Sequence, residues 1–217
     1  MLKISASLAA ANLLDMRLCL NQLNSIPVDS LHYDLEDGCF TPVMSLGLNL
    51  LQQLDTVADQ TIDVHLMIKD PEWILSHLPT RRVRKVSVHY EACLYPRRVL
   101  RKIYQLGFIP GLAFNLATPI LNLDFLEPYL HFVLVLSSDP EEKNSPFVPQ
   151  AIEKIIRGKN LNFNKNLEWQ IDGGINPQNL STVVQMGVTS VVVGRALFSK
   201  NEIQKNWLVL NKIGSKT

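Results

Sequence analysis

The 217-residue sequence has no excess of charge, few cysteines and no long apolar run. Its 21 lysines and arginines balance 20 aspartates and glutamates, and a net charge of +1 gives no field to hold nucleic acid or an anionic membrane. The three cysteines show no CxxC spacing, which argues against a disulfide scaffold or a structural zinc site and fits a reducing cytoplasm. No apolar stretch approaches the roughly 20 residues that span a bilayer.

The N-terminal segment also lacks the uninterrupted apolar stretch of a signal peptide, because Asn12 and Asp15 break it. A strand over Lys3–Ser7 followed by an amphipathic helix explains the segment better. We therefore expect a soluble cytoplasmic protein with neither nucleic-acid nor membrane partners.

What the sequence does contain is a regular alternation of short β-branched runs and helical segments. Strands are predicted over Lys3–Ser7, Ser30–Leu35, Thr61–Met67, Val83–His89, Phe108–Phe114, Phe132–Leu136, Leu167–Asp172 and Ser190–Val193. Helices are predicted over Leu13–Asn24, Leu46–Val57, Pro71–Leu78, Pro96–Leu106, Pro119–Leu126, Pro149–Ile156 and Pro177–Met186.

Strands that alternate with helices indicate a parallel sheet with crossover helices. Eight such repeats favour an α/β fold of the (β/α)₈ TIM-barrel type, at the small end of its size range. The rival is a doubly wound open sheet, which usually carries GxGxxG after its first strand, whereas Ser7 is followed here by Leu-Ala-Ala-Ala. No linker or break in composition appears, so we expect one domain over residues 1–217.

Polar residues end three of the otherwise apolar strands, at the barrel rim where catalytic groups sit. His32 and Asp34 are two apart and share a face, as do Asp63 and His65. The seventh strand ends at Asp172. A lone histidine or aspartate is more often a core or turn residue, but buried charges on three strand ends need pairing or a metal. The combination suits Zn²⁺, Fe²⁺, Mn²⁺ or Co²⁺.

Two glycine turns at the same rim suggest a phosphate site. Gly173-Gly174 runs through Asn176, a good helix cap, into a helix whose N-terminus offers free N–H groups. Gly194-Arg195 follows the last strand and precedes a short helical segment, and Arg195 can add positive charge. TIM barrels often bind phosphate in the loops after these two strands.

Other polar residues allow more than one interpretation. Asp63 either orients His65 or belongs to an interior ion pair, and His89 is either a core residue or part of the pocket wall. Asp37 is assigned to turn chemistry before Gly38.

These residues resemble the ribulose-phosphate 3-epimerase family, and the resemblance extends from Lys3 to Phe198. The segments that carry it are Ser5-Ala6-Ser7-Leu8, His32-Tyr33-Asp34-Leu35-Glu36-Asp37-Gly38-Cys39-Phe40, Asp63-Val64-His65-Leu66-Met67, Ser87-Val88-His89, Asn115-Leu116-Ala117-Thr118-Pro119 and Ile171-Asp172-Gly173-Gly174-Ile175. The resemblance implies a (β/α)₈ barrel, one divalent metal ion, a phosphorylated ketose as substrate and a homo-oligomer.

The resemblance also implies roles for single residues. The metal ligands fall on His32, Asp34, His65 and Asp172, and the two aspartates are the acid–base pair that inverts C3 through an enediolate. The substrate-binding residues fall on Ser7, His65, Gly173, Gly174, Gly194 and Arg195.

The sequence departs from the family at four places. Glu36 replaces a methionine near the metal, and Leu136 stands at the position of the family's strand-six methionine. The glycine-rich lid reads Asp139-Pro140-Glu141-Glu142-Lys143-Asn144-Ser145, and Arg195 stands where serine is usual. Glu36 could add negative charge near the metal, contact a different substrate hydroxyl, or form a salt bridge. The departures indicate a divergent member of the family.

Three functions remain open from the sequence. The first is a metal-dependent 3-epimerase acting on a pentulose or hexulose phosphate. The second is an aldolase or decarboxylase that uses the same enediolate chemistry, although no strand-end lysine suits a Schiff base. The third is a sugar-phosphate sensor without turnover, which the altered lid favours and the intact metal set disfavours.

Overall fold

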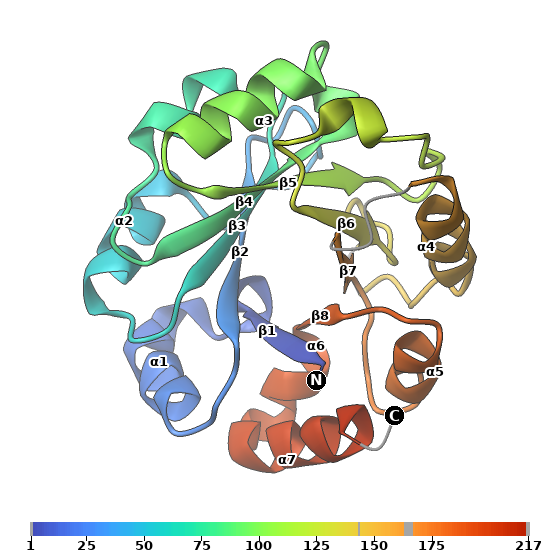
Figure 1. Ribbon diagram of the computed structural model, residues 1–217. Coiled ribbons are helices and arrows are strands. Elements are labelled where there is room, and N and C mark those ends of the chain that lie inside the picture. The colour runs from blue at the N-terminus through green and yellow to red at the C-terminus, as the bar shows by residue number, and fades with distance from the viewer. Residues whose placement is uncertain (1, 143, 163–166, 216–217) are drawn as a thin grey trace.

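The computed structural model describes residues 2–142, 144–162 and 167–215, and its eight strands close into one parallel barrel. The strands are β1 (Lys3–Ser7), β2 (Ser30–Glu36), β3 (Ile62–Met67), β4 (Val83–His89), β5 (Ile109–Phe114), β6 (Phe132–Leu136), β7 (Glu168–Asp172) and β8 (Ser190–Val193). Each strand pairs with the next along the chain, and β8 pairs with β1. The predicted (β/α)₈ barrel is confirmed (Figure 1), and each predicted strand agrees with the structure to within one residue at either end.

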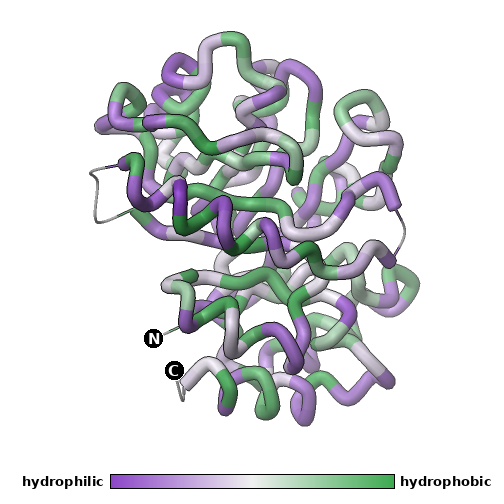
Figure 2. Tube along the Cα trace, turned by 90° about the vertical axis from the view of Figure 1, so that its right-hand side faces the viewer, coloured by the Kyte–Doolittle hydropathy of each residue, from purple (hydrophilic) through white to green (hydrophobic). Residues whose placement is uncertain are grey.

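The helices surround the barrel on its outside (Figure 1). They are α1 (Met16–Asn24), α2 (Leu48–Val57), α3 (Pro96–Gln105), α4 (Gln150–Leu161), α5 (Leu180–Gln185), α6 (Arg195–Phe198) and α7 (Ile203–Gly214). Polar and apolar residues alternate along these helices (Figure 2), as expected where one face packs inward. Among the residues that the structure describes, no helix combines the length and apolar character needed to cross a bilayer.

Two of the predicted helices are wrong. Pro71–Leu78 forms two 3₁₀ turns, Pro71–Trp73 and Leu75–His77, which still bury Ile74 and Leu75. Pro119–Leu126 contains only the 3₁₀ turn Asp124–Leu126. There the side chain of Asn122 accepts a hydrogen bond from the backbone N–H of Asp124, and such local bonds compete with helix formation.

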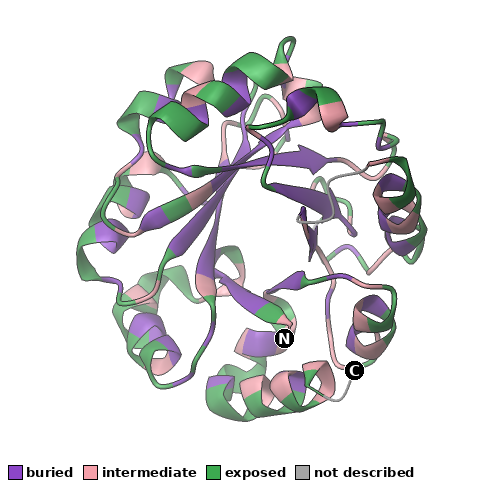
Figure 3. Cartoon of the chain, viewed as in Figure 1, coloured by how far each residue is buried: buried purple, intermediate pink, exposed green. Residues whose placement is uncertain are grey.

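The main core lies between the strands and the helices, so the strands are buried along most of their length (Figure 3). A second, small apolar cluster comes from β5 and β6 alone: Ala113, Phe132, Leu134 and Leu136. The buried polar residues include Ser5, His32, Asp34, Asp63, His65, Ser87, His89, Gln170 and Ser190, all on β1 to β4, β7 and β8. Alternation of side chains along each strand gives the barrel interior this polar lining, which carries the candidate site.

Candidate functional site

Four predicted metal ligands come together at the carboxyl ends of β2, β3 and β7. The parallel register places Asp34 beside His65, and Asp172 ends β7 at the same rim. One ligand atom from each of His32, Asp34, His65 and Asp172 lies within 4.8 Å of all the others. The predicted convergence of these side chains is therefore confirmed.

The two imidazoles present different nitrogens to the carboxylates. Nε2 of His32 lies 3.1 Å from Oδ1 of Asp34 and 3.3 Å from Oδ2 of Asp172. Nδ1 of His65 lies 3.3 Å from Asp34 Oδ1 and 3.7 Å from Asp172 Oδ2. The set thus offers two nitrogen and two carboxylate oxygen donors around one point, a combination typical of divalent transition-metal sites.

The electrostatics of the cluster favour positive charge between the carboxylates. Burial by itself raises the pKa of the Asp34 carboxyl, but the charge of His32 and hydrogen bonds from both histidines outweigh it and hold the pKa well below its usual range. The pKa of Asp172 is lowered for the same reasons. Burial alone lowers the pKa of His32, yet the three surrounding carboxylates raise it well above its usual value.

Asp63 supports His32 and not His65. Its Oδ2 lies 2.9 Å from Nδ1 of His32, because the register of β2 and β3 places these two residues side by side. The interpretation that Asp63 orients His65 is wrong, and that of an interior ion pair fits the observed contact. The nitrogen of His32 that faces away from the cluster is thereby occupied.

His65 has a different partner, which the sequence did not single out as such. Its Nε2 lies 2.8 Å from Nε2 of His89, and the two rings stack with centroids 4.9 Å apart. Nδ1 of His89 lies 3.2 Å from Oε2 of Glu91. Burial lowers the pKa of His89 to about 4, so the ring is neutral at pH 7. Sequence reasoning missed Glu91; its position two residues after His89 is the available signal.

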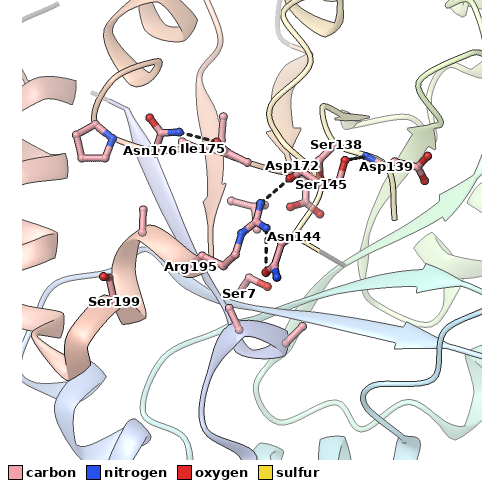
Figure 4. A pocket seen from close by; sticks show the side chains of 18 of the residues that line it. Ser7, Ser138, Asp139, Asn144, Ser145, Asp172, Ile175, Asn176, Arg195 and Ser199 are labelled. Atoms are coloured by element: carbon pink, nitrogen blue, oxygen red, sulfur yellow. Dashed lines mark hydrogen bonds between the residues drawn. The ribbon is translucent and has the colours of Figure 1, made fainter. Parts of the chain in front are cut away.

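A cavity of about 910 Å³ opens beside this cluster, and Asp172 and Ser7 line it (Figure 4). Ser7 also donates a 3.3 Å hydrogen bond to Oδ2 of Asp34. Ser7 therefore contacts both the cavity and Asp34, one of the predicted metal ligands.

The predicted phosphate glycines line the same cavity. Gly173 and Gly174 have φ angles of +116° and +67°, and a Cβ on Gly174 would lie 2.7 Å from the backbone nitrogen of Phe147. A Cβ on Gly194 would lie 2.9 Å from that of Ala10. Asn176 accepts bonds from the N–H groups of the following turn, as predicted for a cap, although α5 itself begins at Leu180. These loops have no room for side chains and expose backbone to the cavity.

Arg195 lies on the rim of the cavity and contacts the predicted lid segment, residues 139–145. It donates hydrogen bonds to Oδ1 of Asn144 at 3.2 Å and to the backbone oxygen of Ser145 at 2.6 Å (Figure 4). Ser145 Oγ in turn accepts a bond from the backbone N–H of Asp139. Lys143, within the same predicted segment, lies outside the described residues.

Glu36 and Asp37 hold the loop after β2. Oε2 of Glu36 accepts hydrogen bonds from the N–H and hydroxyl of Ser45, at 2.8 and 2.6 Å. Among the described residues no ion pair with Glu36 is found, so the salt-bridge alternative has no support there. Asp37 accepts from the N–H groups of Cys39, Phe40 and Lys69, which confirms its turn role.

Comparison with known proteins gives one consistent result. The model of the ribulose-phosphate 3-epimerase family matches residues 3–198. A ribulose-phosphate 3-epimerase from Methanocaldococcus jannaschii is 27% identical over 206 residues, covering 94% of this chain and 87% of that protein. One from Aquifex aeolicus is 32% identical over 178 residues, covering 81% and 80%.

Solved structures share the architecture at low sequence identity. Phosphoribosyl anthranilate isomerase from Thermus thermophilus superimposes with a TM-score of 0.69 and 11% identity, covering all of both chains. Thiamine phosphate pyrophosphorylase from Pyrococcus furiosus gives a TM-score of 0.62 and 13% identity, covering 99% of this chain and 96% of that one. At such identities the likeness concerns the fold alone.

Proposed function

Because the chain belongs to the ribulose-phosphate 3-epimerase family, we propose that it inverts the C3 centre of a ketose phosphate, with ribulose 5-phosphate and xylulose 5-phosphate as the first pair to test. The enzyme is an epimerase acting on carbohydrates. The observation that carries the proposal is the meeting of His32, Asp34, His65 and Asp172 within 4.8 Å, beside a cavity lined by Gly173, Gly174 and Gly194.

The donor set fits one divalent transition-metal ion. Two imidazole nitrogens and two carboxylate oxygens converge, and the nitrogens that face away from the cluster already have partners. The surrounding carboxylates raise the pKa of His32, which shows that this cluster favours positive charge at the position that the ion would occupy. Zn²⁺, Fe²⁺, Mn²⁺ and Co²⁺ are all compatible with these ligands. When bound, the ion would neutralise negative charge on the substrate oxygens.

The two aspartates supply the acid and the base. The hydrogen on C3 lies next to the C2 carbonyl, so its removal gives an enediolate, and inversion requires return of a proton to the opposite face. Asp34 is on β2 and Asp172 on β7, with β1 and β8 between them around the barrel. We assign one face of C3 to each carboxylate, with the roles exchanged in the reverse direction. Ser7, within 3.3 Å of Asp34, would orient that carboxylate or contact the substrate.

The phosphate would bind in the part of the cavity that the glycine turns line. The backbone of the Gly173–Gly174 turn and of Gly194 is accessible there, and Arg195 contributes the positive charge on the rim. Binding the phosphate at a fixed distance from the aspartates would place C3 between them.

The test measures two quantities on the protein loaded with Co²⁺ or Zn²⁺. The first is interconversion of ribulose 5-phosphate and xylulose 5-phosphate, and the second is exchange of the C3 hydrogen with D₂O, followed by NMR. We expect both activities in the parent and a loss of conversion of about 10²- to 10⁴-fold in Asp34→Asn and Asp172→Asn.

The outcomes separate the open alternatives. If both variants exchange the C3 hydrogen as fast as the parent, the acid–base assignment is wrong. Substrate binding without any exchange in the parent would instead select the sugar-phosphate sensor. If pentulose phosphates are inert, the same assay with hexulose phosphates tests the chain length.

A further inference from the structure

His65 and His89 form a direct contact between two imidazole rings that are both fully buried. Their Nε2 atoms lie 2.8 Å apart, and neither residue has any exposed surface. Two ring nitrogens at this distance must share one proton, since two bare nitrogens or two N–H groups would repel each other. One ring therefore donates and the other accepts.

Glu91 decides which ring donates. Its Oε2 lies 3.2 Å from Nδ1 of His89, and its Oε1 accepts the backbone N–H of Asn115 at 2.8 Å. Burial raises the pKa of this carboxyl, but hydrogen bonds from His89 and its other neighbours hold it at about 2, so the group is an acceptor only. The proton of a neutral His89 then lies on Nδ1, which leaves its Nε2 as an acceptor.

The same logic fixes the proton on His65. The bare Nε2 of His89 requires His65 to carry its proton on Nε2, and a neutral His65 then has a free electron pair on Nδ1. That atom is the one that faces the carboxylates, 3.3 Å from Asp34 Oδ1. The order Glu91, His89, His65 thus directs a lone pair toward the proposed metal position.

We propose that His89 and Glu91 are positioning residues that set the tautomer of His65 for metal binding, an inference that rests on the proposed metal-dependent function. The other histidine of the cluster is held by Asp63 directly, at 2.9 Å from its Nδ1. His65 receives the same support through an intervening ring. Outer carboxylates that orient metal-bound histidines typically affect metal affinity about 10- to 100-fold.

The decisive variant is Glu91→Gln, which keeps the size of the side chain and removes only one acceptor. The Asn115 N–H still needs an oxygen, so the new NH₂ group would face His89. This NH₂ group would donate to Nδ1 of His89 and so move the His89 ring proton to Nε2. Two N–H groups would then face each other at the His65–His89 contact, unless His65 placed its own proton on Nδ1. A purely structural role for Glu91 would tolerate this change, whereas the proposed role predicts loss of the metal-binding lone pair.

The experiment titrates metal-free protein with Co²⁺ and follows the visible absorption of the bound ion. We expect Glu91→Gln to bind Co²⁺ about 10- to 100-fold more weakly than the parent. The matched control is Glu72→Gln, whose carboxylate binds the exposed Arg98 and which should bind Co²⁺ as the parent does. A second readout, ¹⁵N NMR of the ring nitrogens, should show His89 as the Nδ1–H tautomer in the parent, with and without Zn²⁺, its signals identified by their loss in His89→Gln.

Each result has one meaning. A parent that binds no Co²⁺ overturns the proposed metal-dependent function. A parent that binds Co²⁺, with Glu91→Gln folded and binding equally well, overturns the role of Glu91. A parent His89 in the Nε2–H form overturns the proposed proton order whether or not any variant folds.

Discussion

Arg195 donates a 2.6 Å hydrogen bond to the backbone carbonyl oxygen of Ser145 and so joins the loop after β8 to the loop after β6. Both residues line the cavity beside the His–Asp cluster (Figure 4). The guanidinium also donates to Oδ1 of Asn144, so it makes two hydrogen bonds to this part of the loop after β6. Arg195 therefore does two things at once: it brings a positive charge to the cavity, and it fixes the position of the loop after β6 through its hydrogen bonds.

Replacing Arg195 tests its part in binding the phosphate. We expect Arg195→Ala to raise KM and the inhibition constant of inorganic phosphate about 10-fold or more, with a smaller change in kcat, because the interaction is made equally in ground and transition states. Arg195→Lys retains the charge but not the paired donors, so its KM should lie between that of the parent and that of Arg195→Ala. Steady-state kinetics at two ionic strengths provide the measurement. An unchanged KM in Arg195→Ala would remove this residue from the substrate site.

The turn after β7 should not accept a side chain. Gly173 has a φ of +116°, and a Cβ there would lie 2.6 Å from the backbone nitrogen of Ser138. We expect Gly173→Ala to lower the free energy of unfolding by about 3 kcal/mol, from backbone strain and steric overlap together, and to weaken phosphate binding. Denaturant titration and phosphate inhibition are the two measurements.

The control for this substitution is Gly47→Ala. Gly47 has an ordinary negative φ of −118° and no atom within 4 Å of the Cβ it would gain. We expect a loss of less than about 1 kcal/mol there, from the weaker helix cap. Equal losses at the two glycines would contradict the assigned role of the turn after β7.

The strands and the convergence of the site could be predicted from sequence because both depend on local pattern. β-branched runs specify the strands, and parallel strands bring their carboxyl ends to one rim, so His32, Asp34, His65 and Asp172 meet once the barrel is recognised. The His65–His89 contact could not be predicted, because it depends on the register of β3 and β4, which includes a shift between Ile62 and Asp63.

Errors in the predicted helices have local causes. Over Pro119–Leu126 the side chain of Asn122 satisfies the backbone N–H that a helix would use. Helix α7 was absent from the predicted elements, although its buried Ile203 and Leu210 are seven residues apart on one face. The absence of a helix over Pro119–Leu126 could be found only from side-chain geometry, whereas the pattern that indicates α7 is present in the sequence.

Glu168 gives the protein a pH-dependent stability at the amino-terminal end of the barrel. Its carboxylate contacts Lys3 at 2.6 Å and Lys85. Burial raises the pKa of Glu168, but the two ammonium groups outweigh it and lower the pKa below its usual value. A lowered folded pKa means stability that is present above the ordinary glutamate pKa, about 4.3, and is lost as the pH falls through the folded value.

We therefore expect Glu168→Gln to cost about 2 kcal/mol at pH 7, a figure reduced because Lys3 is half exposed. The difference from the parent should shrink as the pH falls below about 4. Denaturant titrations from pH 7 to 3 measure this difference in the free energy of unfolding. The control is Glu153→Gln, which removes an exposed ion pair with Arg157 and should change the free energy of unfolding by no more than about 0.5 kcal/mol. A difference that grows toward low pH would contradict the assigned sign.

Gly111 and Phe132 should behave as a coupled pair inside the barrel. They are paired across β5 and β6, and a Cβ on Gly111 would overlap the Phe132 ring. We expect Gly111→Ala to destabilise the protein by about 1–3 kcal/mol through overpacking. Phe132→Leu alone should also destabilise it, by leaving a cavity. Because the smaller leucine makes room for the new methyl group, the double variant should lose less than the sum of the single losses, by about 1 kcal/mol. Denaturant titration of all four proteins completes the cycle, and strict additivity would show that the ring does not limit the residue at position 111.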